Sequence, residues 1–302
     1  MTKQKTKKIK VLLAVLLAGY VLLELGSYAR MHRVDGRGRR VVEELKEAEA
    51  LRPLSAEGRT TVLLVGNSLI REGLNMDTVR AQMGSRYDVH RLIVESTGYP
   101  DWRYALPSLF ERGARPSYVV LTISPSQMNS HVPLFLETTH YLLTLREVLA
   151  MSRHEQGGPS SYAMHLLEYA SPYWGTRTSA QTAVKDKIPG YRALLYAWAG
   201  DKRLPEHFDA ERMKELAEIC RQYNVRLVYA ALPENNPYGD HDALQIQKAA
   251  EANGVSYIRP VSDSDLHGDA YTDFIHMSNT GQAIFEPKFI SELTQTLDAA
   301  GK

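Results

Sequence analysis

The chain has 302 residues, of which 44% are hydrophobic and 24% are charged, and its formal net charge at pH 7 is +1. This composition is typical of a globular protein, and the length is sufficient for one sizeable core and an insertion. The near-neutral balance excludes the strongly basic surface that nucleic-acid binding requires. A single cysteine, Cys220, excludes an intrachain disulfide framework.

The first 29 residues predict a membrane anchor. Five lysines between positions 3 and 10 precede an unbroken apolar run at residues 11–23. As a helix this run reaches only about 20 Å against a hydrocarbon core of about 30 Å, and continuing the helix to Tyr28 restores most of the length. Glu24 would then lie near the far interface, where a charge costs less than at the centre. Because residues 27–29 (SYA) have the small-x-small form that a signal peptidase accepts, a cleaved signal peptide is the alternative.

The basic leader predicts a cytoplasmic N-terminus, so that the remainder of this single-pass protein lies outside the cytoplasm, at the periplasmic or cell-surface side of the membrane. The positive-inside count does not decide this orientation, since five arginines between positions 30 and 40 equal the five leading lysines. Residues 41–51 (VVEELKEAEAL) are typical of a charged helix that ends at Pro53, and we interpret them as a stalk. The predicted organisation is a leader and anchor at 1–29, a stalk at 30–58 and a catalytic domain at 59–302.

The stretch at residues 61–74 (TVLLVGNSLIREGL) predicts a buried strand at 61–65 that runs into a tight turn at Gly66. A small polar residue at the end of such a strand lies at the carboxyl edge of an α/β sheet, where ligands bind. Ser68 is therefore the candidate nucleophile, and Gly66 permits the sharp turn. The alternative is an ordinary strand-to-helix turn in which Ser68 is a local cap.

Strand and helix patterns then alternate, which predicts an α/β fold with a parallel sheet between layers of helices. The further strands are expected at 89–94, 118–123, 225–231 and 255–258, and the helices at 77–83, 102–112, 210–223, 243–252 and 281–297.

An insertion at residues 130–207 interrupts the alternation. It is rich in aromatic residues, including Tyr173 and Trp174, and has helical patches at 142–151, 162–169 and 191–199. Since it leaves the core directly after the third strand, we expect it to cover the carboxyl edge of the sheet near Ser68. Its aromatic side chains would form either a platform for sugar rings or the small core of a helical cap.

The second candidate block is at residues 271–285 (YTDFIHMSNTGQAIF), where Asp273 and His276 stand three positions apart. Of the ten histidines, only His276 has an Asp three residues before it. Such a pair can present a carboxylate and an imidazole to one site, with Asp273 orienting His276 as a base, and Ser278 or Asn279 can cap the helix that follows.

The order of these blocks resembles the SGNH (GDSL-like) hydrolase superfamily. Residues 66–69 (GNSL) correspond to the family's first block and residues 273–276 (DFIH) to its last. The family places a Gly and an Asn between them to complete an oxyanion hole. Gly98 fits the Gly, and Asn129 is the candidate for the Asn, although residues 124–129 (SPSQMN) lack the family's Gly-x-Asn-Asp pattern.

The resemblance implies a three-layer, flavodoxin-like α/β fold and an acyl-enzyme formed on Ser68, with His276 as base and Asp273 as its partner. It also implies an oxyanion held by Gly98, by the backbone at Ser68 and by Asn129. An anchor ahead of these blocks resembles the extracytoplasmic SGNH proteins, D-alanyl transfer proteins among them, that work beside membrane-bound O-acyltransferases. This likeness favours O-acyl transfer to a hydroxyl of an envelope or exported polysaccharide.

Two alternatives remain open at this stage: a polysaccharide esterase, and a non-catalytic glycan-binding subunit, which the departures from the family's pattern support. No nicotinamide, flavin or nucleotide signature is present, so no cofactor is expected. Residues 240–242 (DHD) and 267–269 (HGD) are interpreted as solvated loops and not as metal ligands, because neither has a spaced partner set.

Overall fold

The structure is a computed structural model that describes residues 3–29, 36–129, 141–154, 158–175, 208–234, 239–266, 268–273 and 275–300. These residues form two compact units. One unit comprises Met1–Arg40 and Val148–Lys202, and the other comprises Val41–Glu147 and Arg203–Lys302.

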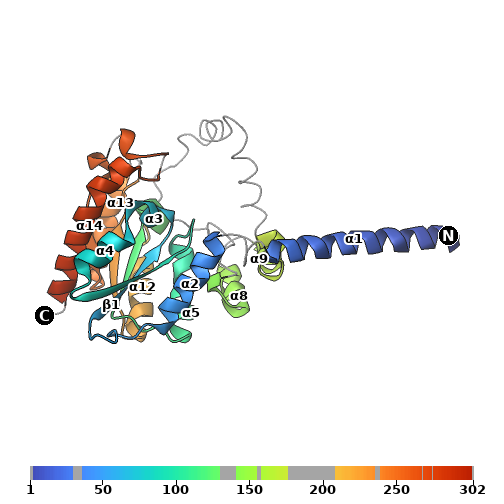
Figure 1. The fold of residues 1–302 in the computed structure, drawn as a ribbon, viewed down its shortest axis with the longest axis horizontal. Coiled ribbons are helices and arrows are strands. Elements are labelled where there is room, and N and C mark those ends of the chain that lie inside the picture. Colours follow the sequence, from blue (N-terminus) through green and yellow to red (C-terminus); the bar gives the residue numbers. More distant parts are fainter. Residues whose placement is uncertain are drawn as a thin grey trace. The chain divides into compact units, whose positions relative to one another are not determined.

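The second unit contains a five-stranded parallel sheet with the strand order β2-β1-β3-β4-β5 (Figure 1). The strands are β1 (Thr60–Gly66), β2 (Tyr87–Ile93), β3 (Tyr118–Ile123), β4 (Arg226–Ala231) and β5 (Ser256–Ile258). This order is that of a doubly wound sheet. From β1 the chain adds β2 on one side, and it then adds β3, β4 and β5 on the other side. In sheets of this kind, ligands bind at the carboxyl ends of the strands where the order reverses, here β1 and β3. The predicted α/β fold class is confirmed.

Helices cover both faces of the sheet. The helices α5 (Tyr99–Glu111), α12 (Glu211–Gln222) and α13 (Gly239–Ala252) pack against one another on one face. On the other face, α14 (Asn279–Ala300) contacts α3 (Ser68–Gly73) and α4 (Met76–Met83) (Figure 1). The observed helices begin and end within four residues of the predicted ranges, as expected for boundaries that depend on local caps.

The core on the α14 face follows from the period of two along the strands. Alternate residues of β1 and β3, such as Val62, Leu64 and Val120, are fully buried together with Phe285 and Phe289 of α14. At about 25 cal/mol per Å² of buried apolar area, large aliphatic and aromatic side chains of this kind dominate the stability of the domain. The edge that carries the strand-end loops is thereby held on a rigid base.

The segment predicted as a stalk instead packs against the domain. The helix α2 (Gly36–Ala50) buries Val41, Leu45 and Ala48, which recur at helical spacing. The buried carboxylate of Glu44 accepts hydrogen bonds from the Ile93 N–H at 2.8 Å and the Arg91 Nε at 2.7 Å. The expectation of a stalk is corrected for this helix, because its apolar stripe requires a surface to bury it and Glu44 is bonded to the domain.

The first unit contains α1 (Lys3–Ala29), part of α8 (Leu145–His154), α9 (Gly158–Ala170) and a helical turn at residues 172–175. Within α1, residues Lys7–Ala29 have a mean hydropathy of 2.1 over their most apolar window and are long enough to cross a membrane. The predicted helical patches at 142–151 and 162–169 fall on α8 and α9, and the patch at 191–199 lies outside the described residues.

Candidate active site

The nucleophile candidate stands where β1 ends. Gly66 is the last residue of β1, and a Cβ there would overlap the backbone and side chain of Thr122 on β3, so the close approach of the two strands requires glycine. Helix α3 begins at Ser68, and the Asn67 Oδ1 accepts the Leu69 N–H at 3.0 Å as its cap. Asn67 is therefore the cap, and Ser68 is the first helical residue with a partly exposed side chain.

Asn67 also fixes three strand-end loops relative to one another. It is fully buried, and its Nδ2 donates to the Thr97 carbonyl at 2.7 Å, after β2, and to the Gln127 Oε1 at 2.8 Å, after β3. Both partners are acceptors, so the amide N–H₂ of an asparagine fits here and a carboxylate does not. This explains why the chain has Asn where the SGNH pattern has Asp.

The second block forms a tight loop before α14. The Asp273 Oδ1 accepts the N–H groups of Ile275 at 2.9 Å and His276 at 2.8 Å, and the Thr272 N–H donates to the His276 carbonyl at 2.8 Å. Ser278 Oγ then accepts the Gly281 N–H at 3.3 Å, so Ser278 caps α14. The loop is closed by local hydrogen bonds that depend on a carboxylate at position 273.

The structure brings Ser68, His276 and Asp273 into one hydrogen-bonded chain. The Ser68 Oγ lies 2.8 Å from the His276 Nε2, and the His276 Nδ1 lies 2.8 Å from the Asp273 Oδ2. Since an ionised carboxylate only accepts, the Asp273 contact places the imidazole proton on Nδ1 and leaves Nε2 free to accept the Ser68 proton. Ser68 and His276 are 208 positions apart in the sequence, and the fold brings them together.

The electrostatics keep Asp273 ionised. Its side chain is 16% exposed, and this burial alone would raise the pKa of the carboxyl group. The hydrogen bonds from the His276 imidazole and from the two backbone N–H groups outweigh burial and hold the pKa below its usual range. At neutral pH the site therefore has a fixed negative charge behind His276.

Gly98 is placed differently from the prediction. It precedes α5, and its N–H donates to the Asp101 Oδ2 at 2.9 Å, so this N–H is engaged as part of a helix cap. The absence of a side chain at Gly98 has another reason, because a Cβ would approach the Gln127 carbonyl oxygen to 2.9 Å. Gly98 serves close packing between the loops after β2 and β3, and does not offer a free N–H while the Asp101 bond is made.

Asn129 lies at the end of α6 (Pro125–Asn129), where it is 3% exposed. Neither of its amide atoms has a hydrogen-bond partner among the described residues, and none of the described contacts joins it to Ser68 or His276. Its proposed role in an oxyanion hole stays a prediction.

Gln127 is the residue that sequence reasoning missed. Its Oε1 accepts both from Asn67 and from the Ser124 N–H, at 2.8 and 3.0 Å, which fixes the orientation of the amide and turns Nε2 away from both. No described residue accepts a hydrogen bond from this Nε2. The signal in the sequence was an amide side chain four residues after the end of β3, which could not be told from that of Asn129 without the fold.

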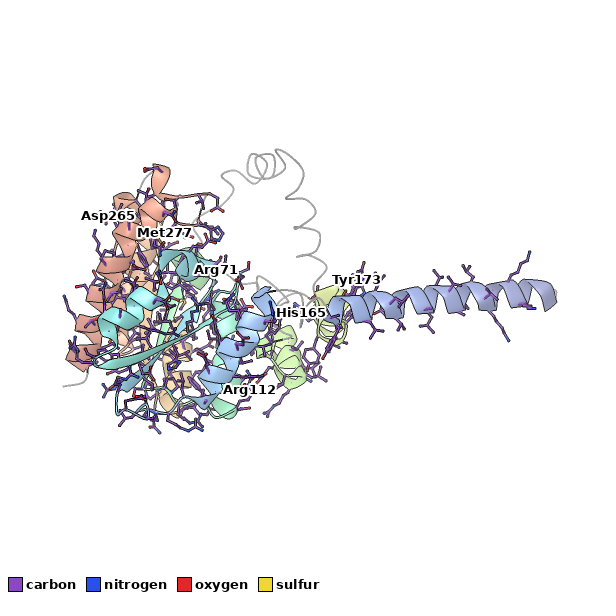
Figure 2. The ribbon with its side chains drawn as sticks, viewed as in Figure 1. Arg71, Arg112, His165, Tyr173, Asp265 and Met277 are labelled. Atoms are coloured by element: carbon purple, nitrogen blue, oxygen red, sulfur yellow. The ribbon has the colours of Figure 1, made fainter. Side chains whose placement is uncertain are left out.

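A polar pocket of about 590 Å³ adjoins these blocks. It is lined by Arg71 and Glu72, one helical turn after Ser68 on α3, and by Thr272, Met277 and Gln282, which flank His276 or follow it on α14. Figure 2 labels Arg71 and Met277. Arg71 is held by ion pairs to Glu72 at 2.9 Å and Glu95 at 3.0 Å. Within the described part of the chain, no group of three His, Cys, Asp or Glu side chains is arranged to hold a metal ion.

Tyr173 and Trp174, predicted to cover Ser68, belong to the unit that contains α1, whereas Ser68 belongs to the other unit. The two rings form an edge-to-face pair with their centroids 6.1 Å apart, and the Tyr173 N–H donates to Glu24 on α1 at 3.1 Å.

No protein-family model matches the chain, and no curated protein matches it. Among solved structures, the chain is similar to a mutant of Axe2, an acetyl-xylooligosaccharide esterase from Geobacillus Stearmophilus, with 10% identity and a TM-score of 0.41 over 80% of this chain and 96% of that one. It is also similar to TesA, with 14% identity and a TM-score of 0.39 over 79% and 98% of the two chains. A third similar structure is the psychrotrophic esterase EstA from Pseudoalteromonas sp., inhibited by monoethylphosphonate, with 11% identity and a TM-score of 0.41 over 79% and 98%. At these values the function of this chain has to be inferred from its own residues.

Proposed function

We propose that the chain is a membrane-anchored serine enzyme of the SGNH type that transfers or hydrolyses ester-linked acyl groups. The observation that supports this most directly is the chain of contacts from Asp273 through His276 to Ser68, with both links at 2.8 Å. A serine hydroxyl is a weak nucleophile by itself, and an adjacent oriented base is what activates it. The order of motifs in the sequence and the parallel sheet agree with this class.

The reaction begins when His276 Nε2 takes the Ser68 proton and Ser68 Oγ attacks the acyl carbonyl carbon. The imidazolium that forms is stabilised by the Asp273 carboxylate across the Nδ1 contact. Collapse of the tetrahedral intermediate breaks the bond to the leaving alkoxide, which receives the proton from His276, and leaves the acyl group on Ser68. Water or another hydroxyl, deprotonated in turn by His276, then takes the acyl group.

Two donors suit the oxyanion of the tetrahedral intermediate. The backbone N–H of Ser68 belongs to the first residue of α3, where N–H groups have no intrahelical acceptor. We assign the second donor to Gln127 Nε2. The Oε1 of the same amide is held by Asn67, which precedes Ser68, and by the Ser124 N–H at the end of β3, so the amide is fixed at the carboxyl edge of the sheet. Gln127 replaces Gly98, whose N–H is taken by Asp101.

The pocket beside the triad favours a substrate rich in hydroxyl groups. Its lining mixes donors and acceptors, such as Arg71, Glu72, Asn279 and Gln282, with a single large apolar residue, Met277. Sugars present such alternating donors and acceptors. Together with a helix fit to span a membrane, this supports an acceptor or substrate among envelope or exported polysaccharides, with a membrane-bound O-acyltransferase as the acyl-donating partner.

Labelling with a serine-directed fluorophosphonate tests the chemistry. We expect stoichiometric labelling of the wild type and its loss in Ser68→Ala, with Ser126→Ala as the matched control that keeps labelling. A wild type that does not label while its circular dichroism shows a folded protein would instead identify a non-catalytic binding subunit.

A second measurement separates transfer from hydrolysis. With a chromogenic acetyl ester as donor, we expect slow release in buffer, faster release with added oligosaccharide, and acetylated sugar by mass spectrometry, because a bound hydroxyl held against the acyl carbon competes with water. Faster release without acetylated sugar, or no response to the sugar, would identify an esterase.

A further inference from the structure

A carboxylate stands inside the apolar stretch of α1. The stretch fit to span a membrane is Lys7–Ala29, whose midpoint is Ala18, and Glu24 follows this midpoint by six residues. At about 1.5 Å per residue, Glu24 lies about 9 Å from the middle of the span, and thus roughly 6 Å inside the edge of a hydrocarbon core about 30 Å thick. A carboxylate at this depth needs hydrogen-bond donors, because no bulk water reaches it.

The donors come from the insertion, about 150 residues later in the sequence. Ser171 Oγ donates to Glu24 Oε1, and the Tyr173 N–H donates to Glu24 Oε2 at 3.1 Å. Both residues belong to the same compact unit as α1. Each carboxylate oxygen of Glu24 thus accepts a hydrogen bond from the short stretch that follows α9.

Ser171 organises this contact. Its Oγ also accepts the Trp174 N–H at 3.1 Å and the Tyr20 hydroxyl at 3.4 Å, while the Gly175 N–H donates to the Ser171 carbonyl at 2.9 Å. Ser171 therefore caps the helical turn at residues 172–175, and the Glu24 carboxylate accepts from Ser171 and Tyr173 at the start of that stretch. The contact is formed by a folded turn and not by one exposed side chain meeting another.

The surroundings of this contact match a lipid interface. The large apolar side chains of α1 from Val11 to Leu25 are all 41% to 69% exposed, as expected of a helix whose partner is lipid. Tyr28 of α1, four residues after Glu24, and Tyr173 and Trp174 of the turn bonded to Glu24 are three amphipathic aromatic residues toward the end of the span (Figure 2 labels Tyr173). Tyr and Trp concentrate at membrane interfaces, where the ring is in the apolar zone and the polar atom reaches water.

We propose that the turn at residues 171–175 inserts into the membrane interface on the side where α1 ends, and that Glu24 holds it there. The partner of this surface is the lipid bilayer itself. The inference rests on the anchor in the proposed function but not on the serine chemistry. It gives Tyr173 and Trp174 a role as interfacial residues in place of the predicted sugar platform, and it favours an anchor retained in the mature protein, since cleavage after Ala29 would remove Glu24.

Site-specific fluorescence tests the depth of the turn. Cysteines at Tyr173→Cys and Trp174→Cys in the full chain, reconstituted into phosphatidylcholine and phosphatidylglycerol vesicles, can be labelled with a polarity-sensitive nitrobenzoxadiazole. Each substitution keeps the backbone N–H that makes the contact. The native Cys220 does not interfere, because it is fully buried and burial raises the pKa of its thiol to about 12.

We expect blue-shifted emission at 173 and 174, strong quenching by lipids that carry a nitroxide near the headgroup and weak quenching by aqueous iodide. The matched control is Leu244→Cys on α13, which is 52% exposed in the other unit and should give water-like emission. Labels at 173 and 174 as accessible to iodide as the label at 244 would overturn the proposal.

Glu24 variants test the cause. Glu24→Gln keeps an acceptor oxygen and should keep the blue-shifted emission at both labelled positions, whereas Glu24→Leu removes it and should make the labels several-fold more accessible to iodide. The same emission in Glu24→Leu would overturn the role of Glu24. Release of the wild type by alkaline carbonate would overturn both the anchor and the insertion, while fluorophosphonate labelling of Ser68 reports the serine chemistry independently.

Discussion

Two clusters in this protein are each built around a carboxylate, Asp273 in one and Glu24 in the other, and they differ in the residues to which the carboxylate is connected. Asp273 accepts from His276 Nδ1 and from two backbone N–H groups, and the two residues that follow in this series of contacts, His276 and Ser68, are partly exposed. Glu24 accepts from Ser171 and Tyr173, and the same Ser171 is also bonded by Tyr20 and Trp174.

The difference separates chemistry from attachment. The Asp273 cluster ends in the Ser68 hydroxyl, which can react with a substrate. The Glu24 carboxylate instead accepts hydrogen bonds from the turn at residues 171–175. A buried carboxylate alone therefore does not indicate a catalytic site. An accessible nucleophile with an oriented base beside it is also required. We expect the largest effects from changes in the Asp273 cluster and the smallest effect on turnover from a change in the Glu24 cluster.

Removing either reactive residue should have the largest effect. Ser68→Ala and His276→Ala should each lower kcat on a chromogenic ester by on the order of a thousandfold or more, and the double variant should be hardly slower than either single variant, because the two act as one unit. Steady-state kinetics measures this. Losses that multiply would show that Ser68 and His276 act independently.

Gln127→Glu should have the next largest effect, with kcat lower by about a hundredfold. Glutamate keeps an acceptor for Asn67 and Ser124 but has no N–H to donate to the oxyanion, so the melting temperature should change little. Gln245→Glu, at a partly exposed position on α13, is the matched control and should leave kcat unchanged. Full activity in Gln127→Glu would contradict the role of Gln127 as an oxyanion donor and would leave the Ser68 N–H as the remaining assigned donor.

Asn67→Asp restores the residue of the SGNH pattern and should nevertheless destabilise the protein. A carboxylate oxygen would face the Thr97 carbonyl and Gln127 Oε1, both acceptors, in a fully buried position. Each buried group left unpaired costs about 1–3 kcal/mol, so chemical denaturation should show a clear loss of free energy of unfolding. Asn75→Asp, where an exposed side chain only accepts, should have a small effect, and equal stability of the two variants would contradict the orientation assigned to Asn67.

The pH dependence of stability should identify Asp273. Because the folded-state pKa of Asp273 lies below its unfolded value of about 3.9, its ionised form stabilises the fold above that pH, and this contribution disappears as the pH falls through the folded-state pKa. The difference in melting temperature between wild type and Asp273→Asn should be constant near neutral pH and shrink below about pH 4. A difference that persists unchanged at pH 2 would exclude a role for this charge in stability.

Glu24→Leu should have the smallest effect on turnover. Glu24 and Ser68 belong to different compact units, so detergent-solubilised Glu24→Leu should hydrolyse a small chromogenic ester at a rate within about twofold of wild type. A loss comparable with that of Ser68→Ala would mean that the two clusters are coupled.

Much of the fold could be predicted because its signals are local. Buried strands of β-branched residues alternate with amphipathic helices, and this pattern leads to a parallel sheet with little ambiguity. Ser68, Asp273 and His276 could be selected because each follows or precedes an element whose position the pattern gives. The packing of α2 was missed because the surface that buries Val41 and Leu45 is not visible in local sequence, whereas the Asp101 cap of Gly98 is a local signal, three residues away, that was overlooked.

By itself, the sequence determined the alternation of strands and helices, the apolar stretch at the N-terminus and the residue types available at the strand ends. Only the tertiary structure decided that Asn67 donates to two loops, that Gln127 Oε1 accepts from Asn67 and Ser124, and that Glu24 accepts from Ser171. The physical reason is that propensity and periodicity act over a few residues, whereas a polar side chain finds its donors and acceptors among groups that the packed sheet and helices bring together from distant parts of the chain.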